Sequence, residues 1–229
     1  MYKGLSRLSE DYDRLLKEVH SILEGQTGHL SVGLLEGQLV DETLRDILNS
    51  FRTGYPGILV ELNRYTFRTM LEALSEQSLD IGITLSVDVK NRADLDYLPL
   101  YALRNEMVLP SGHPLAKKEK LTLADFADEV FVEIEKEDSD IISELMEKSC
   151  QQAGFQPKLL KAQNLKSQIF YVESGIGIAA FNEYHQTCNH PGLVHIPLPE
   201  LPMVEFCAAW QKPFLNPAAE LFVSELQNI

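Results

Sequence analysis

Two short stretches of the chain contain residues of the types that bind metals or cofactors. The first holds His185, Cys188 and His190, and imidazole nitrogen and thiolate sulfur are the ligands that zinc prefers. Their spacing fits none of the common zinc patterns, and no fourth ligand stands nearby. We interpret the group as part of an ordinary polar loop and predict no metal site.

The second stretch, residues 175–180, has the Gly-x-Gly-x-x-Ala spacing of a dinucleotide-binding turn. In dinucleotide sites these glycines link a strand to the helix whose N-terminus binds the pyrophosphate. Here they precede and enter an apolar run that reads as a strand, so we predict no bound cofactor. The sequence also has no Gly-x-Ser-x-Gly elbow, no phosphate-binding loop and no His-Glu-x-x-His motif. We therefore expect no catalytic residues and no enzymatic activity.

The overall composition limits the classes of partner. The chain has 229 residues, 45% of them hydrophobic, and a formal net charge of −14 at pH 7. An acidic surface disfavours direct binding to nucleic acid or to an anionic membrane. No apolar run approaches the roughly 18 residues of a membrane span, and the N-terminal residues lack the apolar core of a signal peptide. Three cysteines, an odd number, indicate reduced thiols, so we expect a cytoplasmic protein.

The elements that would position a binding site begin in residues 28–84. Apolar periodicity predicts strands and helices in alternation, in the order strand 29–34, helix 39–51, strand 58–62, helix 66–75 and strand 79–83. Asp41 is available as the N-cap of the first helix. This alternation is typical of a parallel α/β unit, in which ligands bind beyond the carboxyl ends of the strands.

The same plan repeats in the second half of the chain. We expect strands at 130–134, 158–162 and 175–181, and helices over 141–146 and 165–172. Asp138 or Ser139 could cap the first of these helices. The remaining segments are predicted as a polar connection at 86–94, strands at 95–100, 104–110, 193–198 and 204–210, a short helix at 121–126 and a last helix from Pro217.

This order predicts an α/β protein with two Rossmann-like lobes joined by two crossover strands. We expect the backbone to cross near residues 101–104 and again near 201–205. The first lobe would then comprise residues 26–102 and 204–229, and the second lobe residues 103–203. Two lobes joined in this way form a clamshell, with a ligand expected between them.

Residues 1–25 carry a separate pattern. Apolar side chains recur at steps of three and four, as in a coiled-coil seam, at Leu5, Leu8, Tyr12, Leu15, Val19 and Ile22. We predict a self-associating helix, because the polar segment 25–28 separates it from the first strand. The alternative is an amphipathic helix that lies on the body of the protein.

Six sequence motifs, in order along the chain, resemble the effector-binding region of LysR-type transcriptional regulators. They are Gly28-His-Leu-Ser-Val-Gly33, Phe51-Arg-Thr-Gly-Tyr-Pro56, Leu79-Asp-Ile-Gly-Ile83, Met107-Val-Leu-Pro-Ser-Gly-His-Pro-Leu115, Leu123-Ala-Asp-Phe126 and Val172-Glu-Ser-Gly-Ile-Gly-Ile-Ala179. The resemblance covers residues 28–229 and implies a type 2 periplasmic-binding-protein clamshell. It also implies a small-molecule effector.

The resemblance implies that residues 1–25 form the linker helix that pairs between subunits in this family. It implies a homodimer or homotetramer, in which the helix over 39–51 could contribute to pairing. It also implies that DNA is bound only through an N-terminal winged helix-turn-helix outside this chain. We therefore interpret the chain as the sensing and oligomerisation region of a transcriptional regulator.

The resemblance places the effector at the loops after the strands and at helix N-termini. The first of these loops reads Leu34-Leu35-Glu36-Gly37, where many members of the family have Ser or Thr. The acidic Glu36 argues against a simple carboxylate effector and allows an amino-bearing or partly apolar one. Arg64 and Arg68 could pair with Glu36 or with an anionic ligand, although surface ion pairing is the simpler role.

The predicted effector-binding residues come from these loops and from the crossing segments. They are Leu35, Glu36, Tyr65, Thr66, Phe67, Thr84, Tyr101, Glu135 and Gln163. For each loop residue the alternative is a solvated side chain, and for Tyr101, like Phe206 beside the second crossing, it is core packing.

Two other classes of protein share the expected fold. A free-standing solute-binding protein would need a secretion signal, which the sequence does not show. An enzyme on the same clamshell would need an acid, a base and a nucleophile converging in the cleft, and no such group is evident.

Overall fold

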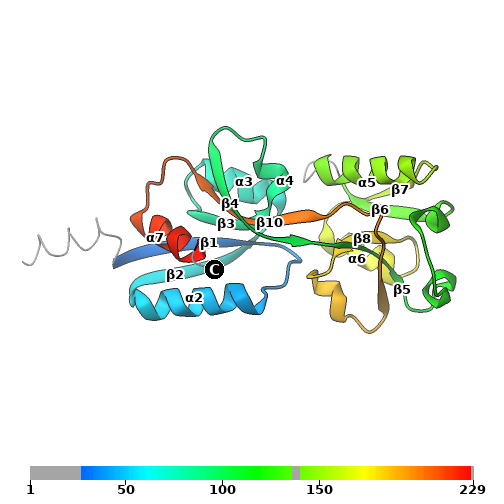
Figure 1. Ribbon diagram of the computed structural model, residues 1–229, viewed down its shortest axis with the longest axis horizontal. Helices are drawn as coiled ribbons and strands as arrows, with labels where there is room; N and C mark the ends of the chain where they lie inside the picture. The colour runs from blue at the N-terminus through cyan, green and yellow to red at the C-terminus, as the bar shows by residue number, and fades with distance from the viewer. Residues whose placement is uncertain (1–26, 136–139, 228–229) are drawn as a thin grey trace, which may run out of the picture.

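The computed structural model describes residues 27–135 and 140–227, and it consists of two α/β lobes side by side (Figure 1). The predicted self-associating helix in residues 1–25 and the predicted caps Asp138 and Ser139 lie outside the described residues. The two-lobe architecture predicted from the order of strands and helices is confirmed.

The first lobe is built on a five-stranded sheet in the order β2-β1-β3-β10-β4. Strand β1 pairs in parallel with β2 and β3, whereas β10 is antiparallel to both β3 and β4. Strand β10 therefore lies inside this sheet although it comes from the end of the chain. The strands are β1 (Thr27–Leu35), β2 (Gly57–Tyr65), β3 (Ile81–Leu85), β4 (Leu95–Leu103) and β10 (Val204–Gln211).

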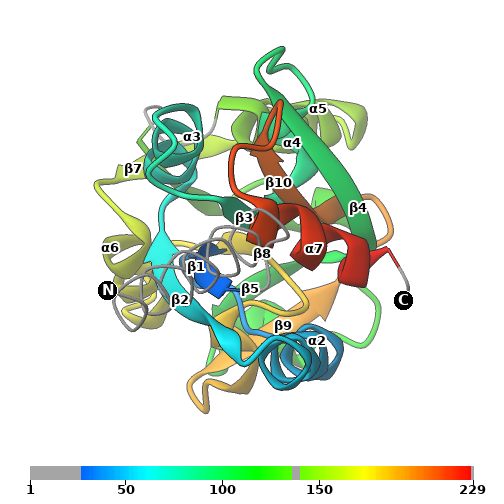
Figure 2. The same ribbon diagram turned by 90° about the vertical axis from the view of Figure 1, so that its left-hand side faces the viewer.

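Helices cover this sheet (Figure 2): α2 (Glu42–Gly54), α3 (Phe67–Ser75), α4 (Ser86–Val89) and α7 (Pro217–Leu226). The predicted N-cap is confirmed, since the Asp41 carboxylate accepts a 2.8 Å hydrogen bond from the backbone N–H of Leu44. The polar connection predicted at 86–94 was wrong in part, because its first residues form α4. This helix is too short to show a periodic pattern, and burial of Ser86 and Val89 holds it against the lobe.

The second lobe contains a three-stranded sheet, β8-β5-β9, and the parallel pair β6-β7. Backbone hydrogen bonds between Ile178 and strand β6 connect the two, from Val132 N–H to the Ile178 carbonyl (2.7 Å) and from Ile178 N–H to the Val130 carbonyl (2.8 Å). The strands are β5 (Asn105–Pro110), β6 (Val130–Ile134), β7 (Lys158–Ala162), β8 (Ala179–Asn182) and β9 (Leu193–Pro197).

The strand predicted over 175–181 starts later than expected, at Ala179. Gly175 has φ +69°, which a strand does not allow. Gly177 lies so close to β6 that a Cβ there would be 2.5 Å from the Val130 carbonyl oxygen. The two glycines thus turn the chain and let it approach β6, and no helix follows them directly.

Among the described residues, two α-helices and three short 3₁₀ helices complete the second lobe: α5 (Asp140–Gln152), α6 (Leu165–Glu173), η1 (Pro114–Lys117), η2 (Leu123–Phe126) and η3 (Gln186–Asn189). The short helix predicted at 121–126 is the 3₁₀ helix η2, which begins later, after a capping box between Thr122 and Asp125.

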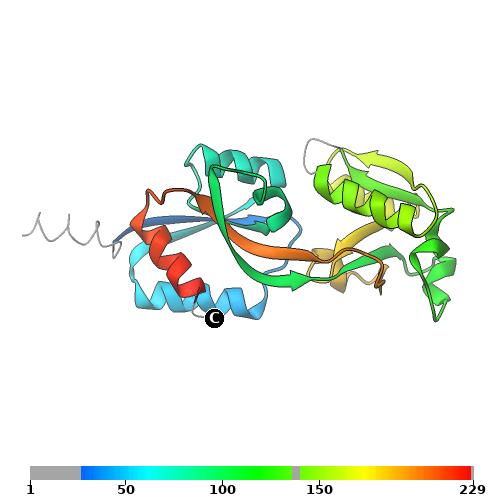
Figure 3. The ribbon, with the colours of Figure 1, turned by 45° about the horizontal axis from the view of Figure 1, so that its top comes forward.

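Two segments cross between the lobes, and Figure 3 shows them running side by side. One passes from β4 to β5, and the other leads from β9 into β10. They are paired at the boundary, where Val204 lies opposite Leu103. Separate apolar cores flank the crossing, one around Phe51, Phe206 and Phe222 and the other around Phe126 and Phe131. No helix in the described parts of the chain is long and apolar enough to cross a membrane.

Candidate functional site

A cavity of about 180 Å³ is lined by residues of both lobes. The first lobe contributes the loop after β1, the start of α3 and the end of β3. The second lobe contributes β6, α5, α6 and β8. The lining includes Leu35, Glu36, Gln38, Thr66, Phe67, Leu85, Asn105, Phe131, Glu133, Ile142, Ser143, Met146, Asn164, Leu165, Gln168, Ala180, Phe181, Asn182, His185 and Val204.

The loop after β1 makes a tight turn held from both sides. The backbone N–H of Gln38 donates to the Leu35 carbonyl (3.2 Å), and Gly37 has φ +80°. Arg64 Nη1 donates to the carbonyl oxygens of Leu35 (2.9 Å) and Gln38. The structure thus gives Arg64 a role in holding the loop, which the sequence analysis did not foresee.

The same loop is bonded to the second lobe. The Leu39 N–H donates to the Tyr184 carbonyl (2.8 Å), and the Gln186 N–H donates to the Gly37 carbonyl (2.7 Å). Between these bonds, Asn182 Nδ2 donates to Gln38 Oε1 over 2.8 Å, and both side chains are buried. This contact forms one wall of the cavity from both lobes.

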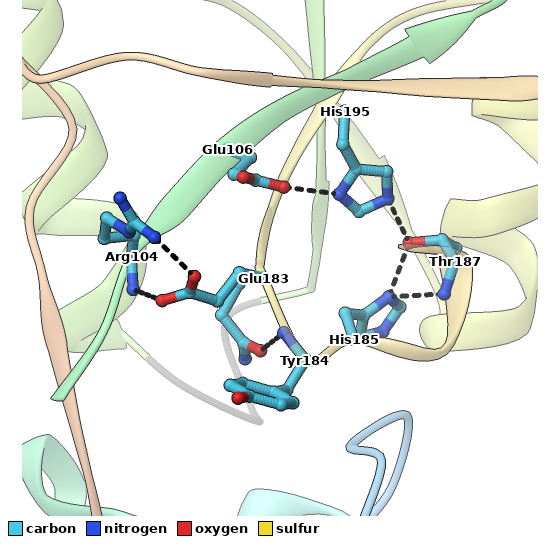
Figure 4. A network of polar contacts seen from close by, with 8 residues as sticks. Arg104, Glu106, Glu183, Tyr184, His185, Thr187 and His195 are labelled. Atoms are coloured by element: carbon cyan, nitrogen blue, oxygen red, sulfur yellow. Dashed lines mark hydrogen bonds and ion pairs between the residues drawn. The ribbon is translucent and has the colours of Figure 1, made fainter. Parts of the chain in front are cut away.

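A polar network behind this wall links His185 to Glu106 (Figure 4). His185 Nδ1 accepts from the backbone N–H of Thr187 (3.4 Å) and lies 2.8 Å from the Thr187 hydroxyl oxygen. That hydroxyl is 3.0 Å from His195 Nε2, and His195 Nδ1 is 3.0 Å from Glu106 Oε2. The chain of contacts fixes the orientation of the buried His185 ring.

The environment of His185 keeps it uncharged. Its ring is stacked on Phe181 with centroids 4.0 Å apart, and it is only 5% exposed. Burial, and to a lesser degree the neighbouring His195, lowers the pKa of His185 to about 3. The ring is therefore neutral at neutral pH and presents a hydrogen-bonding group, not a charge, to its surroundings.

Arg104 and Glu183 pin the first crossing segment to the same part of the second lobe (Figure 4). The Glu183 carboxylate accepts from the Arg104 backbone N–H (2.9 Å) and from its guanidinium (3.1 Å). These hydrogen bonds, the backbone one foremost, lower the pKa of Glu183. The crossing is thus fixed beside the wall that Gln38 and Asn182 form.

The charged residues that line the cavity are acidic. Glu36 and Glu133 line it, and no Lys or Arg does so within the described ranges 27–135 and 140–227. Glu133 Oε2 accepts from Lys161 Nζ at 2.6 Å. Most other lining side chains are apolar, so the cavity suits a small molecule with a substantial apolar part.

The structure brings four of the predicted effector-binding residues together at the cavity, namely Leu35, Glu36, Thr66 and Phe67. The other five lie elsewhere, as follows. Tyr65 and Thr84 are on β2 and β3 of the first sheet, Tyr101 packs on Phe206 with ring centroids 5.3 Å apart, and Glu135 and Gln163 are exposed at the ends of β6 and β7. The part of each residue in effector binding stays a prediction.

Sequence reasoning missed Gln38, Asn182 and His185 at the cavity, as well as the α5 side chains Ile142, Ser143 and Met146. Asn182 ends β8, so the rule that points to the carboxyl ends of strands could have found it. His185 was considered only as a metal ligand. Within the described residues, no three His, Cys, Asp or Glu side chains are arranged to hold a metal ion, and His190 instead contacts Glu173 at 3.0 Å.

Two α/β lobes, two crossing strands and a cavity between the lobes define a periplasmic-binding-protein-like ligand-binding domain. A family model described as "LysR substrate binding domain" matches residues 23–228. The chain belongs to this family, as the six motifs predicted.

Curated relatives of the chain are transcriptional regulators. The chain is 26% identical over 224 residues to "Uncharacterized HTH-type transcriptional regulator YybE" of Bacillus subtilis, which covers 96% of this chain and 74% of that protein. It is 26% identical over 201 residues to "HTH-type transcriptional regulator AlsR" of the same organism, with 87% and 66% covered. The chain thus spans about two thirds to three quarters of the length of these relatives.

Solved structures show the same fold. The effector-binding domain of QuiR in complex with shikimate superimposes with a TM-score of 0.75 at 19% identity, covering 88% of this chain and 96% of that one. The LysR family regulator CbnR superimposes with a TM-score of 0.74 at 14% identity, covering 98% and 77%.

Proposed function

We propose that this chain is the effector-sensing region of a cytoplasmic LysR-type transcriptional regulator. A small metabolite binds in the cavity between the lobes and controls DNA binding by a winged helix-turn-helix outside this chain. The observation that carries this proposal is a cavity lined from both lobes in a member of the LysR substrate-binding-domain family. A role in sensing, not in catalysis, agrees with the regulators among the relatives.

The cavity walls couple ligand binding to the relative placement of the two lobes. A ligand that touches Thr66 of the first lobe and Phe181 of the second contributes free energy that depends on how the lobes are placed. The pairing of the loop after β1 with residues 182–186 is the part of the wall most directly coupled to that placement. A ligand that binds one arrangement of the lobes more tightly than another, by typically about 1–3 kcal/mol, is enough to shift the equilibrium between two states of the regulator.

Self-association is the second part of the proposal, as a homodimer or homotetramer. Strand β2 is an edge strand whose Leu59 and Leu62 are 69% and 48% exposed. Strand β7 and helix α6 of the other lobe carry the exposed apolar side chains of Leu159 and Phe170. Exposed apolar side chains on an edge strand and a neighbouring helix are typical of an interface.

A thermal-shift screen against small metabolites tests the sensing role. A ligand at about 100 times its dissociation constant adds about 2.7 kcal/mol to stability, which raises the melting temperature of a domain of this size by roughly 5–11 °C. Ser143 lines the cavity on α5, so Ser143→Trp should fill it and abolish the shift. Glu144→Trp, at the next and exposed position, is the matched control and should keep it. If no metabolite stabilises the unaltered chain, the sensing proposal is wrong.

A further inference from the structure

Two buried N–H groups at the cavity have no hydrogen-bond partner within the part of the chain that the structure describes. They are Nε2 of Gln38 and Nε2 of His185. Both residues line the cavity, and they are 4% and 5% exposed. Buried polar groups are nearly always paired, so these two nitrogens, together with the unpaired Oε1 of Glu133 in the same lining, point to missing ligand atoms.

The orientation of the Gln38 amide follows from a fixed donor. The backbone N–H of Tyr184 donates to Asn182 Oδ1 at 3.0 Å, and a backbone N–H cannot act as an acceptor. Asn182 must therefore present its Nδ2 to Gln38, whose Oε1 accepts at 2.8 Å. This leaves the Gln38 NH₂ group as the free end of the amide, and it is a donor.

The tautomer of His185 follows in the same way. The backbone N–H of Thr187 donates to His185 Nδ1, so this nitrogen carries a lone pair. With a lone pair there, the Thr187 hydroxyl also donates to Nδ1, and His195 donates through Nε2 to that hydroxyl and through Nδ1 to Glu106. A neutral imidazole with an acceptor at Nδ1 has its proton on Nε2. The low pKa of His185 agrees with a neutral ring. His185 therefore offers a second N–H donor.

The two donors belong to residues of opposite lobes whose backbones are paired. Gln38 and His185 form an isolated antiparallel β-bridge between the loop after β1 and the segment after β8. One acceptor oxygen placed beside them would therefore be held from both lobes. The cavity around them is mainly apolar and includes the carboxylates of Glu36 and Glu133.

We propose that Gln38 and His185 together bind an uncharged acceptor oxygen, a carbonyl or carboxamide, of a mainly apolar effector. This inference rests on the function proposed above and names the chemical class of the ligand. A free carboxylate is disfavoured because the lining lacks Lys and Arg within the described residues and holds the carboxylate of Glu36 as well as that of Glu133, which is paired with Lys161.

The two helix N-termini at the cavity do not reverse this preference. At the start of α3, the Thr66 hydroxyl already accepts from the Thr69 N–H, at 3.3 Å. At the start of α6, Asn164 Oδ1 already accepts from the Ser167 N–H, at 3.0 Å. Each cap occupies a backbone N–H group that would otherwise be available to donate a hydrogen bond to an anion.

Three probes with the same ring test the preference on the unaltered chain: benzamide, benzoate and benzylamine. We expect benzamide to raise the melting temperature and to bind at least about tenfold more tightly than the other two, measured by calorimetry or ligand-observed NMR. Tighter binding of benzoate or of benzylamine than of benzamide would overturn the inference.

The variant Gln38→Glu tests the donor directly. Its carboxylate can still accept from Asn182, but an oxygen replaces the NH₂ group. We expect benzamide to bind about tenfold more weakly and benzylamine to gain affinity. Gln156→Glu, the same change at an exposed position outside the cavity lining, is the matched control and should leave both affinities unchanged. Equal benzamide affinity for Gln38→Glu and the unaltered chain would overturn the inference.

A third measurement does not depend on the folding of a variant. In ¹⁵N-histidine spectra of the unaltered chain, His185 should show the Nε2–H tautomer, and benzamide should shift its Nε2 signal. A proton on Nδ1, or an unmoved signal with benzamide bound, would overturn the inference. If metabolites stabilise the chain but benzamide does not bind, the inference about the chemical class of the ligand is wrong, whereas the proposed effector binding still stands. Failure of every metabolite would reject the proposed function itself.

Discussion

Asn182 of the second lobe donates a buried 2.8 Å hydrogen bond to Gln38 of the first lobe, 144 positions away in sequence. The bond lies between two backbone contacts of the same segments, so the lobes are joined by a small antiparallel patch as well as by the crossing strands. The relative placement of the lobes thus depends on side chains that also line the cavity.

Removing this bond should loosen the two lobes. In Asn182→Ala, Gln38 Oε1 loses its partner while it remains buried, which typically costs about 1–3 kcal/mol. We expect chemical denaturation to show a loss of this size in the free energy of unfolding. Asn189→Ala, at an exposed position in η3, is the control and should change stability by less than about 0.5 kcal/mol. Equal stability of the two variants would show that the bond does not contribute.

Gly37 should tolerate no side chain. A Cβ there would be 2.5 Å from Leu165 Cδ2 and 2.6 Å from His185 Nε2, and φ +80° is itself unfavourable for alanine. We expect Gly37→Ala to lower the free energy of unfolding by about 1–3 kcal/mol and to weaken any ligand found by thermal shift. Gly112→Ala has nothing within 4 Å of the added carbon and should be close to neutral. A neutral Gly37→Ala would contradict the close contact between loop and second lobe.

Stability should fall on mild acidification because of His185. The folded state holds the pKa of His185 near 3, whereas an unfolded histidine titrates near about 6.5. The unfolded state therefore binds the extra proton below about pH 6.5, and stability falls by up to about 1.4 kcal/mol per pH unit. Carboxylates with lowered pKa values, such as Asp125 beside Lys118, reduce stability only when the pH falls below about 4.5.

Denaturation curves between pH 7 and pH 5 check this expectation. His185→Gln should be less stable at pH 7, because it loses the stack on Phe181, but its stability should depend less on pH over this range. His190→Gln provides a control outside the buried network. An unchanged pH dependence in His185→Gln would mean that the ring is not kept neutral by burial.

Self-association should depend on the exposed edge of the first sheet. We expect light scattering to show a dimer or larger assembly, and Leu59→Glu on β2 to shift it toward the monomer. Leu215→Glu is the control, because Leu215 is exposed to a similar extent, 65% against 69%, but lies in the turn before α7. A strict monomer in the unaltered chain, with residues 1–25 present, would contradict the assembly proposal.

Local patterns in the sequence were enough to predict the order of the elements. Alternating apolar residues mark β1, and Asp41 marks the start of α2, because these signals depend on neighbours in the chain. The rule for parallel strands also placed Leu35 and Thr66 among the residues expected at the cleft, and both line the cavity.

The contact between lobes could not be predicted in this way. Gln38, Asn182 and His185 meet only when the two lobes are assembled. Asn182 stands at the end of a predicted strand, but nothing in the sequence pairs it with Gln38 or His185. The orientation of their polar ends depends on backbone N–H groups of Tyr184 and Thr187, which exist as fixed donors only in the folded segment. Helix α4 was missed for a related reason, since burial and not periodicity holds it.

The position of β10 has a consequence for synthesis on the ribosome. This strand fills the place between β3 and β4, yet it is made after the whole second lobe. During translation, the backbone edges of β3 and β4 that pair with β10 stay unpaired. The sheet of the first lobe can therefore be completed only after residues 204–211 have emerged. The half that is translated first is therefore the half that finishes folding last.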